Sequence, residues 1–139
     1  MRWLTWALLS ALFAGLTAVL AKVGVSTINS NLATAIRTTV ILIFTWTIAF
    51  GTGGTHGIAE VSRQSWIFLV LSGIATGLSW LCYFRALQIG EVAKVAPIDK
   101  LSVVAAMLLS ILFLGERLNL RGAIGATLIV SGAVVLALP

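Results

Sequence analysis

Five charged side chains lie inside or at the ends of long apolar stretches, and their types suit the binding of a small charged molecule. They are Lys22, Arg37, Arg85, Asp99 and Lys100. Guanidinium and ammonium groups attract carboxylates and phosphates, while an aspartate can set the local charge or accept a coupling proton. An ionisable group within a membrane is by default a functional candidate that faces a partner. We therefore expect these residues to form a substrate-binding site.

Simpler explanations remain open for the basic residues. The long side chains of Lys22, Arg85 and Lys100 can extend to the membrane surface with no further role. Arg37 is harder to explain in this way, because it lies five residues inside its apolar stretch, about 7 Å along a helix. Basic residues from several segments are expected at the same end of the bundle. A cavity that binds an anionic or zwitterionic group would explain why they gather there.

Asp99 also has two interpretations. Pro97 can occupy the first position of a helix, which would place Asp99 two residues later, where the helix dipole favours a carboxylate. Alternatively, Asp99 pairs with Arg37 or Arg85 across the bundle, because an unpaired charge at that depth costs about 2.5 to 3.5 kcal/mol. We predict the pairing, with the pair lining a water-accessible cavity.

Other kinds of chemistry find no support in the sequence. It shows no pairing of a nucleophile with a base, no phosphate-binding loop and no cluster of residues at metal-ligand spacing, and His56 is a lone histidine. We therefore expect a protein that is not an enzyme and that holds no metal or cofactor. The net charge of +5 does not indicate nucleic-acid binding, because the basic residues sit singly at the ends of apolar stretches.

The composition indicates an integral membrane protein. Hydrophobic residues make up 60% of the 139 residues, charged residues make up 9%, and the mean hydropathy is +1.11. Such a chain cannot present a polar surface to water on all sides. We expect an all-α protein in which one domain, residues 1–139, holds five membrane spans. The spans are predicted at about 3–21, 32–50, 66–88, 95–114 and 121–138.

Two of these spans need comment. The fourth is long enough only if it extends back from the apolar run at 101–114 to about Val95, so that Pro97, Asp99 and Lys100 lie in its first turns. The first follows Arg2 and ends near small residues, as a signal peptide does. It is longer than the apolar region of a signal peptide, however, and four more spans follow, so we expect it to be retained.

The basic residues are spread almost evenly over the two faces of the predicted bundle. Arg2, Arg63, Arg117 and Arg121 fall on the face of the N-terminus. Lys22, Arg85, Lys94 and Lys100 fall on the other face, with Arg37 a little deeper. Orientation in the membrane follows the difference in Lys and Arg between faces. Since that difference is small here, we expect copies to insert in both orientations. The alternative is that lipids, an insertase or the first helix decide the orientation.

Several motifs in the C-terminal part of the chain resemble those of the EamA domain, the unit of the drug/metabolite transporter superfamily. An "AL" ends the third helix, an "AP" opens the fourth, "LGER" closes it, and "GxxLIxxG" lies in the fifth. In this chain these are Ala86 and Leu87, Ala96 and Pro97, Leu114 to Arg117, and Gly125, Leu128, Ile129 and Gly132. With "AKVGV" at 21–25 and "AIRTTVILI" at 35–43, the likeness extends over the whole chain and is to the short, single-unit, five-helix bacterial and archaeal members.

The resemblance implies a carrier for small metabolites. Most of the superfamily has two such units of opposite orientation in one chain, so the resemblance implies that a single unit forms a homodimer. We expect the antiparallel pair on which alternating access is built. The last helix also resembles the dimerisation helix of the small multidrug resistance proteins, which places Gly125, Ile129 and Gly132 at the dimer interface. Those proteins use a glutamate in their first helix to export cations. The first helix here has none, which favours an anionic or zwitterionic substrate.

We therefore expect a secondary transporter of the inner (plasma) membrane that acts as a homodimer on a small metabolite, in contact with membrane lipid. Two alternatives remain open. One is a flippase subunit for a lipid-linked anion. The other is a membrane scaffold or assembly subunit that does not transport, in which the charged residues serve only helix assembly.

Overall fold

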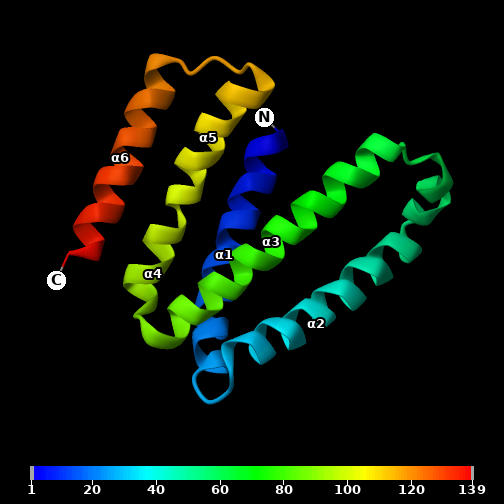
Figure 1. Ribbon diagram of the computed structural model, residues 1–139, viewed down its shortest axis with the longest axis horizontal. Coiled ribbons are helices and arrows are strands. Elements are labelled where there is room, and N and C mark those ends of the chain that lie inside the picture. The colour runs from blue at the N-terminus through cyan, green and yellow to red at the C-terminus, as the bar shows by residue number, and fades with distance from the viewer. Residues whose placement is uncertain (1, 139) are drawn as a thin grey trace. The chain divides into compact units, whose positions relative to one another are not determined.

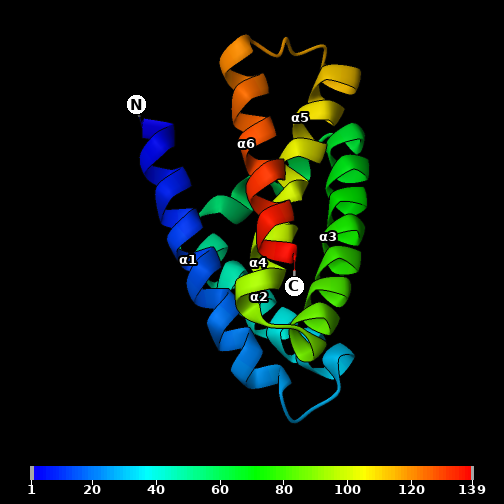
Figure 2. The same cartoon turned by 90° about the vertical axis from the view of Figure 1, so that its left-hand side faces the viewer.

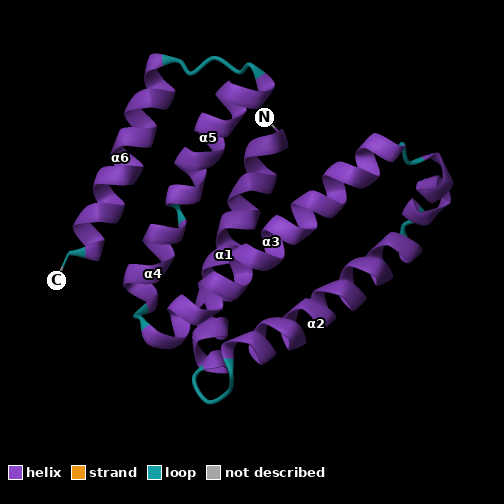
Figure 3. Cartoon of the chain, in the orientation of Figure 1, coloured by secondary structure: helices purple, strands orange, loops and turns teal. Residues whose placement is uncertain are grey.

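The computed structural model of the chain describes residues 2–138, so Met1 and Pro139, the ends of the predicted domain, lie outside the described residues. The part described is helical, with no strand (Figure 3). The helices are α1 (Arg2–Val25), α2 (Ser30–Gly51), the 3₁₀ helix η1 (Gly54–Glu60), α3 (Arg63–Ile89), α4 (Val92–Asp99), α5 (Leu101–Leu114) and α6 (Leu120–Ala137).

Five helical segments are long and apolar enough to cross a membrane. They are Trp3–Val25, Ser30–Gly51, Arg63–Ile89, Val92–Leu114 and Leu120–Ala137. Large apolar side chains on them are exposed, for example Leu112 at 76% and Phe113 at 81%. Such exposure suits a chain whose surface faces lipid. The predicted all-α membrane fold with five spans is confirmed.

The fourth span is two helices rather than one. The chain is extended at Glu91 and becomes helical at Val92, so Pro97 lies inside α4 and Asp99 is its last residue. Proline has no N–H to donate, and its ring clashes with the carbonyl four residues before it. Figure 3 shows a short break between α4 and α5. At this break the N–H of Lys100 bonds to the carbonyl of Pro97 at 3.1 Å. The alternative interpretation, in which Pro97 takes the first position of this helix and Asp99 lies two residues later, is wrong, because the helix begins at Val92.

The chain divides into two compact units. Unit 1 contains the residues up to Lys22 and those from Ile89 onward, and unit 2 is Val23–Gln88. In unit 1, α6 packs against α4 and α5 (Figure 2). A side chain added at Gly122 would lie 2.9 Å from Cδ1 of Leu118 and 3.5 Å from Cε of Met107, so glycine permits a close approach at the start of α6.

Unit 2 is a helical hairpin in which α2 and α3 are joined through η1 (Figure 1). Its buried residues come from the end of α1, the start of α2 and the end of α3: Val25, Ser30, Ala33, Thr34, Phe84 and Leu87. The start of α2 is defined by Asn29, whose side-chain oxygen accepts hydrogen bonds from the N–H groups of Asn31 and Leu32. The buried side chains of unit 2 thus lie at the end of the hairpin that also carries Arg37 and Arg85.

Candidate functional site

Arg37 lies within α2 and stacks on aromatic rings of α3. It is about 10 Å beyond Ser30 along the helix axis, deeper than the sequence suggested, because α2 begins before the apolar run. Its guanidinium carbon is 4.4 Å from the centre of the Trp80 ring and 5.4 Å from that of Phe84. These are cation–π contacts, which are strongest away from water. They fix the position of a positive charge inside a membrane span.

The sequence of α3 explains how the two rings come together. Trp80 and Phe84 are four residues apart, so they project from the same face of the helix one turn from each other. Phe84 is buried, with 3% of its surface exposed, which holds its ring in place. The site therefore combines one guanidinium with two aromatic side chains from the neighbouring helix.

The polar neighbours of Arg37 on its own helix are already hydrogen-bonded. The hydroxyl of Thr34 donates to the carbonyl of Ser30 at 2.8 Å, and that of Thr38 donates to the carbonyl of Thr34 at 2.8 Å. Among the described residues, no hydrogen bond or salt bridge joins the Arg37 side chain to another side chain or to the backbone. The N–H donors of the Arg37 side chain therefore have no hydrogen-bond acceptor among the described residues.

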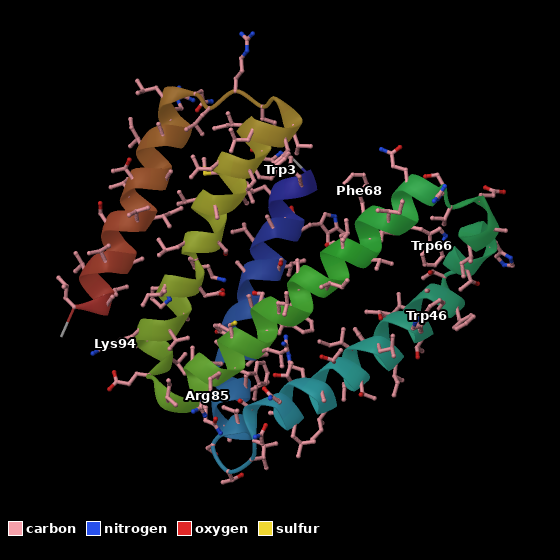
Figure 4. All side chains as sticks on the ribbon, viewed as in Figure 1. Trp3, Trp46, Trp66, Phe68, Arg85 and Lys94 are labelled. Atoms are coloured by element: carbon pink, nitrogen blue, oxygen red, sulfur yellow. The ribbon has the colours of Figure 1, made fainter. Side chains whose placement is uncertain are left out.

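Arg85 lies near the end of α3, away from the Trp46 and Trp66 end of the hairpin (Figure 4). Its Nη1 donates to Oε1 of Gln88 at 2.7 Å. The Nε2 of Gln88 in turn donates to the carbonyls of Ile28 at 2.9 Å and Val25 at 3.4 Å. This chain of hydrogen bonds ties α3 to the loop between α1 and α2, and Arg85 orients the amide that makes the connection.

Lys22 also holds a loop. Its Nζ donates to the carbonyl of Gly90 at 2.8 Å, in the short connection between α3 and α4. This carbonyl follows directly on the end of α3, where helix carbonyls lack helical partners and the dipole favours a cation. Lys22 thus joins α1 to a residue far along the chain within unit 1.

Asp99 and Lys100 form an ion pair at the break between α4 and α5. Nζ of Lys100 is 3.5 Å from Oδ2 of Asp99, and the two side chains are 56% and 35% exposed. A long, partly exposed pair of this kind contributes little stability. Asp99 and Lys100 belong to unit 1, whereas Arg37 and Arg85 belong to unit 2, so the pairing of Asp99 with either arginine stays a prediction.

Two sets of contacts were not predicted from the sequence, those of Arg37 with the rings of Trp80 and Phe84 and those of the Gln88 amide. The signal was present, because Trp80, Phe84 and Gln88 follow one another at intervals of four residues and so share a face of α3. Nothing in the sequence shows which residue on α2 meets that face. Among the described residues, no group of three His, Cys, Asp or Glu could hold a metal ion.

The three residues predicted at a dimer interface lie on α6. A side chain added at Gly125 or at Gly132 would meet no atom within 4 Å, whereas Ala133 is 4% exposed and faces the inside. Ile129 is half-buried. Gly125 and Gly132 are two helical turns apart and so lie on one face. Their role in contact between two copies stays a prediction.

An all-α fold with five helical segments long and apolar enough to cross a membrane defines a multi-pass membrane protein. Comparison with known proteins gives the class. The EamA-like transporter family matches residues 1–138, and the chain belongs to this family. It is therefore a membrane transporter, as the resemblance in its sequence implied.

Two relatives agree with this assignment. A protein described as "Uncharacterized transporter in cobO 3'region", from Sinorhizobium sp, is 55% identical over 135 residues, which cover 97% of this chain and 96% of the relative. "Uncharacterized transporter YxxF" of Bacillus subtilis (strain 168) is 30% identical over 129 residues, which cover 91% of this chain and 40% of the relative. No solved structure matches the chain significantly.

Proposed function

We propose that this protein is a secondary transporter for a small anionic or zwitterionic metabolite, and that Arg37 binds the charged group of the substrate. The observation that carries the proposal is the position of the Arg37 guanidinium, 4.4 Å from the centre of the Trp80 ring inside the second span. A charged group within a membrane is costly and is characteristic of substrate and ion pathways. The contact with Trp80 offsets part of that cost without neutralising the charge.

The other charged residues support this role from the ends of the helices. Lys22, Arg85 and Lys100 raise the positive potential that attracts an anion. In this conformation Lys22 and Arg85 also hold loops, and movement between conformations can exchange those bonds for substrate contacts. Asp99 sets the local charge or accepts a coupling proton. Its place at a helix break is favourable, because discontinuous helices commonly form the ion and substrate sites of transporters.

The transporter acts as a homodimer in the inner (plasma) membrane, and each copy contributes one domain of five spans. Alternating access is built on two units of opposite orientation, and the even spread of Lys and Arg over the two faces supports dual insertion. Two copies inserted in opposite directions then pair and rock about a cavity near the middle of the membrane.

The decisive experiment is metabolite exchange in proteoliposomes, run with and without a pH gradient. The variant Arg37→Gln removes the charge but keeps a polar side chain. We expect exchange to fall to the level of empty liposomes, while folding and dimer content stay at the wild-type level. Arg63→Gln serves as the control, because Arg63 begins α3 at the other end of the hairpin. Full exchange by Arg37→Gln would contradict the role of Arg37.

The same variant separates the alternatives. If the protein is a scaffold, Arg37→Gln should reduce assembly with partner proteins and leave no transport to lose. If it is a flippase subunit for a lipid-linked anion, soluble metabolites should not exchange, but a fluorescent anionic lipid should cross the bilayer with wild-type protein and not with Arg37→Gln.

A further inference from the structure

The chain passes between its two compact units at two crossings, and both lie at the end of a helix. It leaves unit 1 between Lys22 and Val23, in the last turn of α1, and returns between Gln88 and Ile89, at the end of α3. Hinges in proteins are commonly a few residues at the ends of elements, where backbone angles can change without disturbing the rest of a helix. Each crossing therefore lies where a hinge can form.

Hydrogen bonds hold the two crossings next to each other. The Nζ of Lys22 donates to the carbonyl of Gly90 at 2.8 Å, and both residues belong to unit 1. The Nε2 of Gln88 donates to the carbonyls of Val25 and Ile28, and these residues all belong to unit 2. Each of these bonds lies within one unit. They therefore keep the crossings together without opposing a movement of one unit against the other.

Each crossing also contains a glycine. Helical bonding weakens at the end of α1, where the N–H of Ser26 reaches the carbonyl of Val23 at a distance of 3.4 Å. Gly24 lies between them, and a side chain added there would meet no atom within 4 Å, so packing does not require glycine. At the other crossing, Gly90 separates the end of α3 from the extended Glu91. Because glycine has the widest range of backbone angles, both crossings can absorb a rotation.

From these observations we infer that Gly24 and Gly90 form a hinge about which unit 2 moves against unit 1. This inference rests on the proposed function, whose alternating access it makes more specific, because it names the part of each copy that moves: the hairpin of α2 and α3. A single pivot would let the hairpin turn in any direction. Two adjacent pivots restrict it to rotation about the line that joins them, so the movement has a defined axis.

The test is the distance between two spin labels in one copy, measured by double electron–electron resonance in lipid nanodiscs. The labels are attached to His56→Cys in η1 of unit 2 and Arg117→Cys in the loop after α5 of unit 1, with Cys82→Ser as background. An excess of unlabelled protein ensures that each dimer holds at most one labelled copy. We expect two separate distance populations. The pair Thr27→Cys and His56→Cys, both in unit 2, should give one narrow peak.

Gly24→Ala tests the pivot in α1. Alanine favours the helical conformation over glycine by about fivefold, and its side chain meets no atom within 4 Å, so the fold should be kept. We expect the ratio of the two distance populations to change by about the same factor. The matched control is Gly15→Ala, in the middle of α1 and within unit 1, where an added side chain also meets no atom. It should leave the ratio unchanged.

Three results would overturn the inference: one narrow peak for the labels at positions 56 and 117, a distribution within unit 2 as broad as that between the units, or equal effects of Gly24→Ala and Gly15→Ala. None of them touches the proposed function, which depends on loss of metabolite exchange in Arg37→Gln. A protein that exchanges a metabolite through Arg37 but shows a single distance between its units is a transporter that moves in another way.

Discussion

At the scale of residues, the amide of Gln88 connects parts of unit 2 that lie far apart in the chain. It receives a hydrogen bond from Arg85 on its oxygen and donates from its nitrogen to the carbonyls of Val25 and Ile28. An amide can do both at once, because it carries an acceptor and a donor on the same planar group. Neither glutamate nor leucine can replace it fully, since glutamate has no donor when ionised and leucine has neither group.

We predict that Gln88→Leu loosens the loop between α1 and α2. Loss of three hydrogen bonds, one of them long, should lower the free energy of unfolding by about 2 kcal/mol. Residues 26–29 should become more open to protease. Stability would be followed by denaturation in mixed micelles. Gln64→Leu, in the exposed first turn of α3, is the matched control and should behave as the wild type. Equal protease sensitivity of the two variants would show that the hydrogen bonds of Gln88 do not hold this loop.

The charged residues of the candidate site could be identified from sequence, because charge stands out in an apolar chain, but most of their contacts could not. Arg37 was expected to face a partner, and that partner was expected to be an acid. In unit 2 it is a pair of aromatic rings. Cation–π contact depends on which faces of two helices meet, and this is a property of tertiary packing that helix periodicity within one segment does not reveal.

At the scale of elements, the number of spans follows from hydropathy, while their ends follow from local hydrogen bonding. The second, third and fourth helices begin at Ser30, Arg63 and Val92, each before the apolar run that predicted it. Asn29 accepts two N–H groups of α2, and the hydroxyl of Ser62 accepts the N–H of Ser65 in α3. A polar cap extends α2 and α3 beyond their apolar parts, so hydropathy alone sets these two starts too late. Glu91 at the start of α4 makes no such bond, and nothing comparable explains that start.

The break between α4 and α5 leads to a second prediction. Pro97→Ala supplies the missing N–H and removes the clash with the preceding turn. We expect a higher melting temperature and slower amide hydrogen exchange around residues 93–97, the turn that proline disturbs. If proline also causes the break at Lys100, α4 and α5 should join as one helix and exchange should slow around residues 98–102 as well. If the break serves movement between conformations, metabolite exchange should fall severalfold although the protein is more stable. Unchanged hydrogen exchange at the break would show that proline is not its cause.

At the scale of the whole molecule, the proposed association of two copies depends on surfaces that one copy leaves open. In lipid there is no hydrophobic drive between helices, so close packing of small residues carries much of the association. Gly125 and Gly132 lie on one face of α6, and a side chain at either would meet no atom of the chain within 4 Å. A larger residue at these positions therefore disturbs one copy little and acts on whatever packs against that face from outside.

The last prediction follows from the open surroundings of Gly125 and Gly132. Gly125→Leu or Gly132→Leu should leave the fold of one copy intact but hold two α6 helices apart, and should lower the dimer fraction in detergent by about tenfold, as expected for loss of a close helix contact. The measurement is crosslinking of purified protein.

Gly73→Leu is the matched control, since Gly73 on α3 has the same open surroundings but is not predicted at the interface. Gly122→Leu instead should destabilise the single copy, because its side chain would meet Leu118 and Met107. A dimer fraction that falls as much with Gly73→Leu as with Gly132→Leu would assign the effect to the detergent-facing surface in general and remove α6 as the interface.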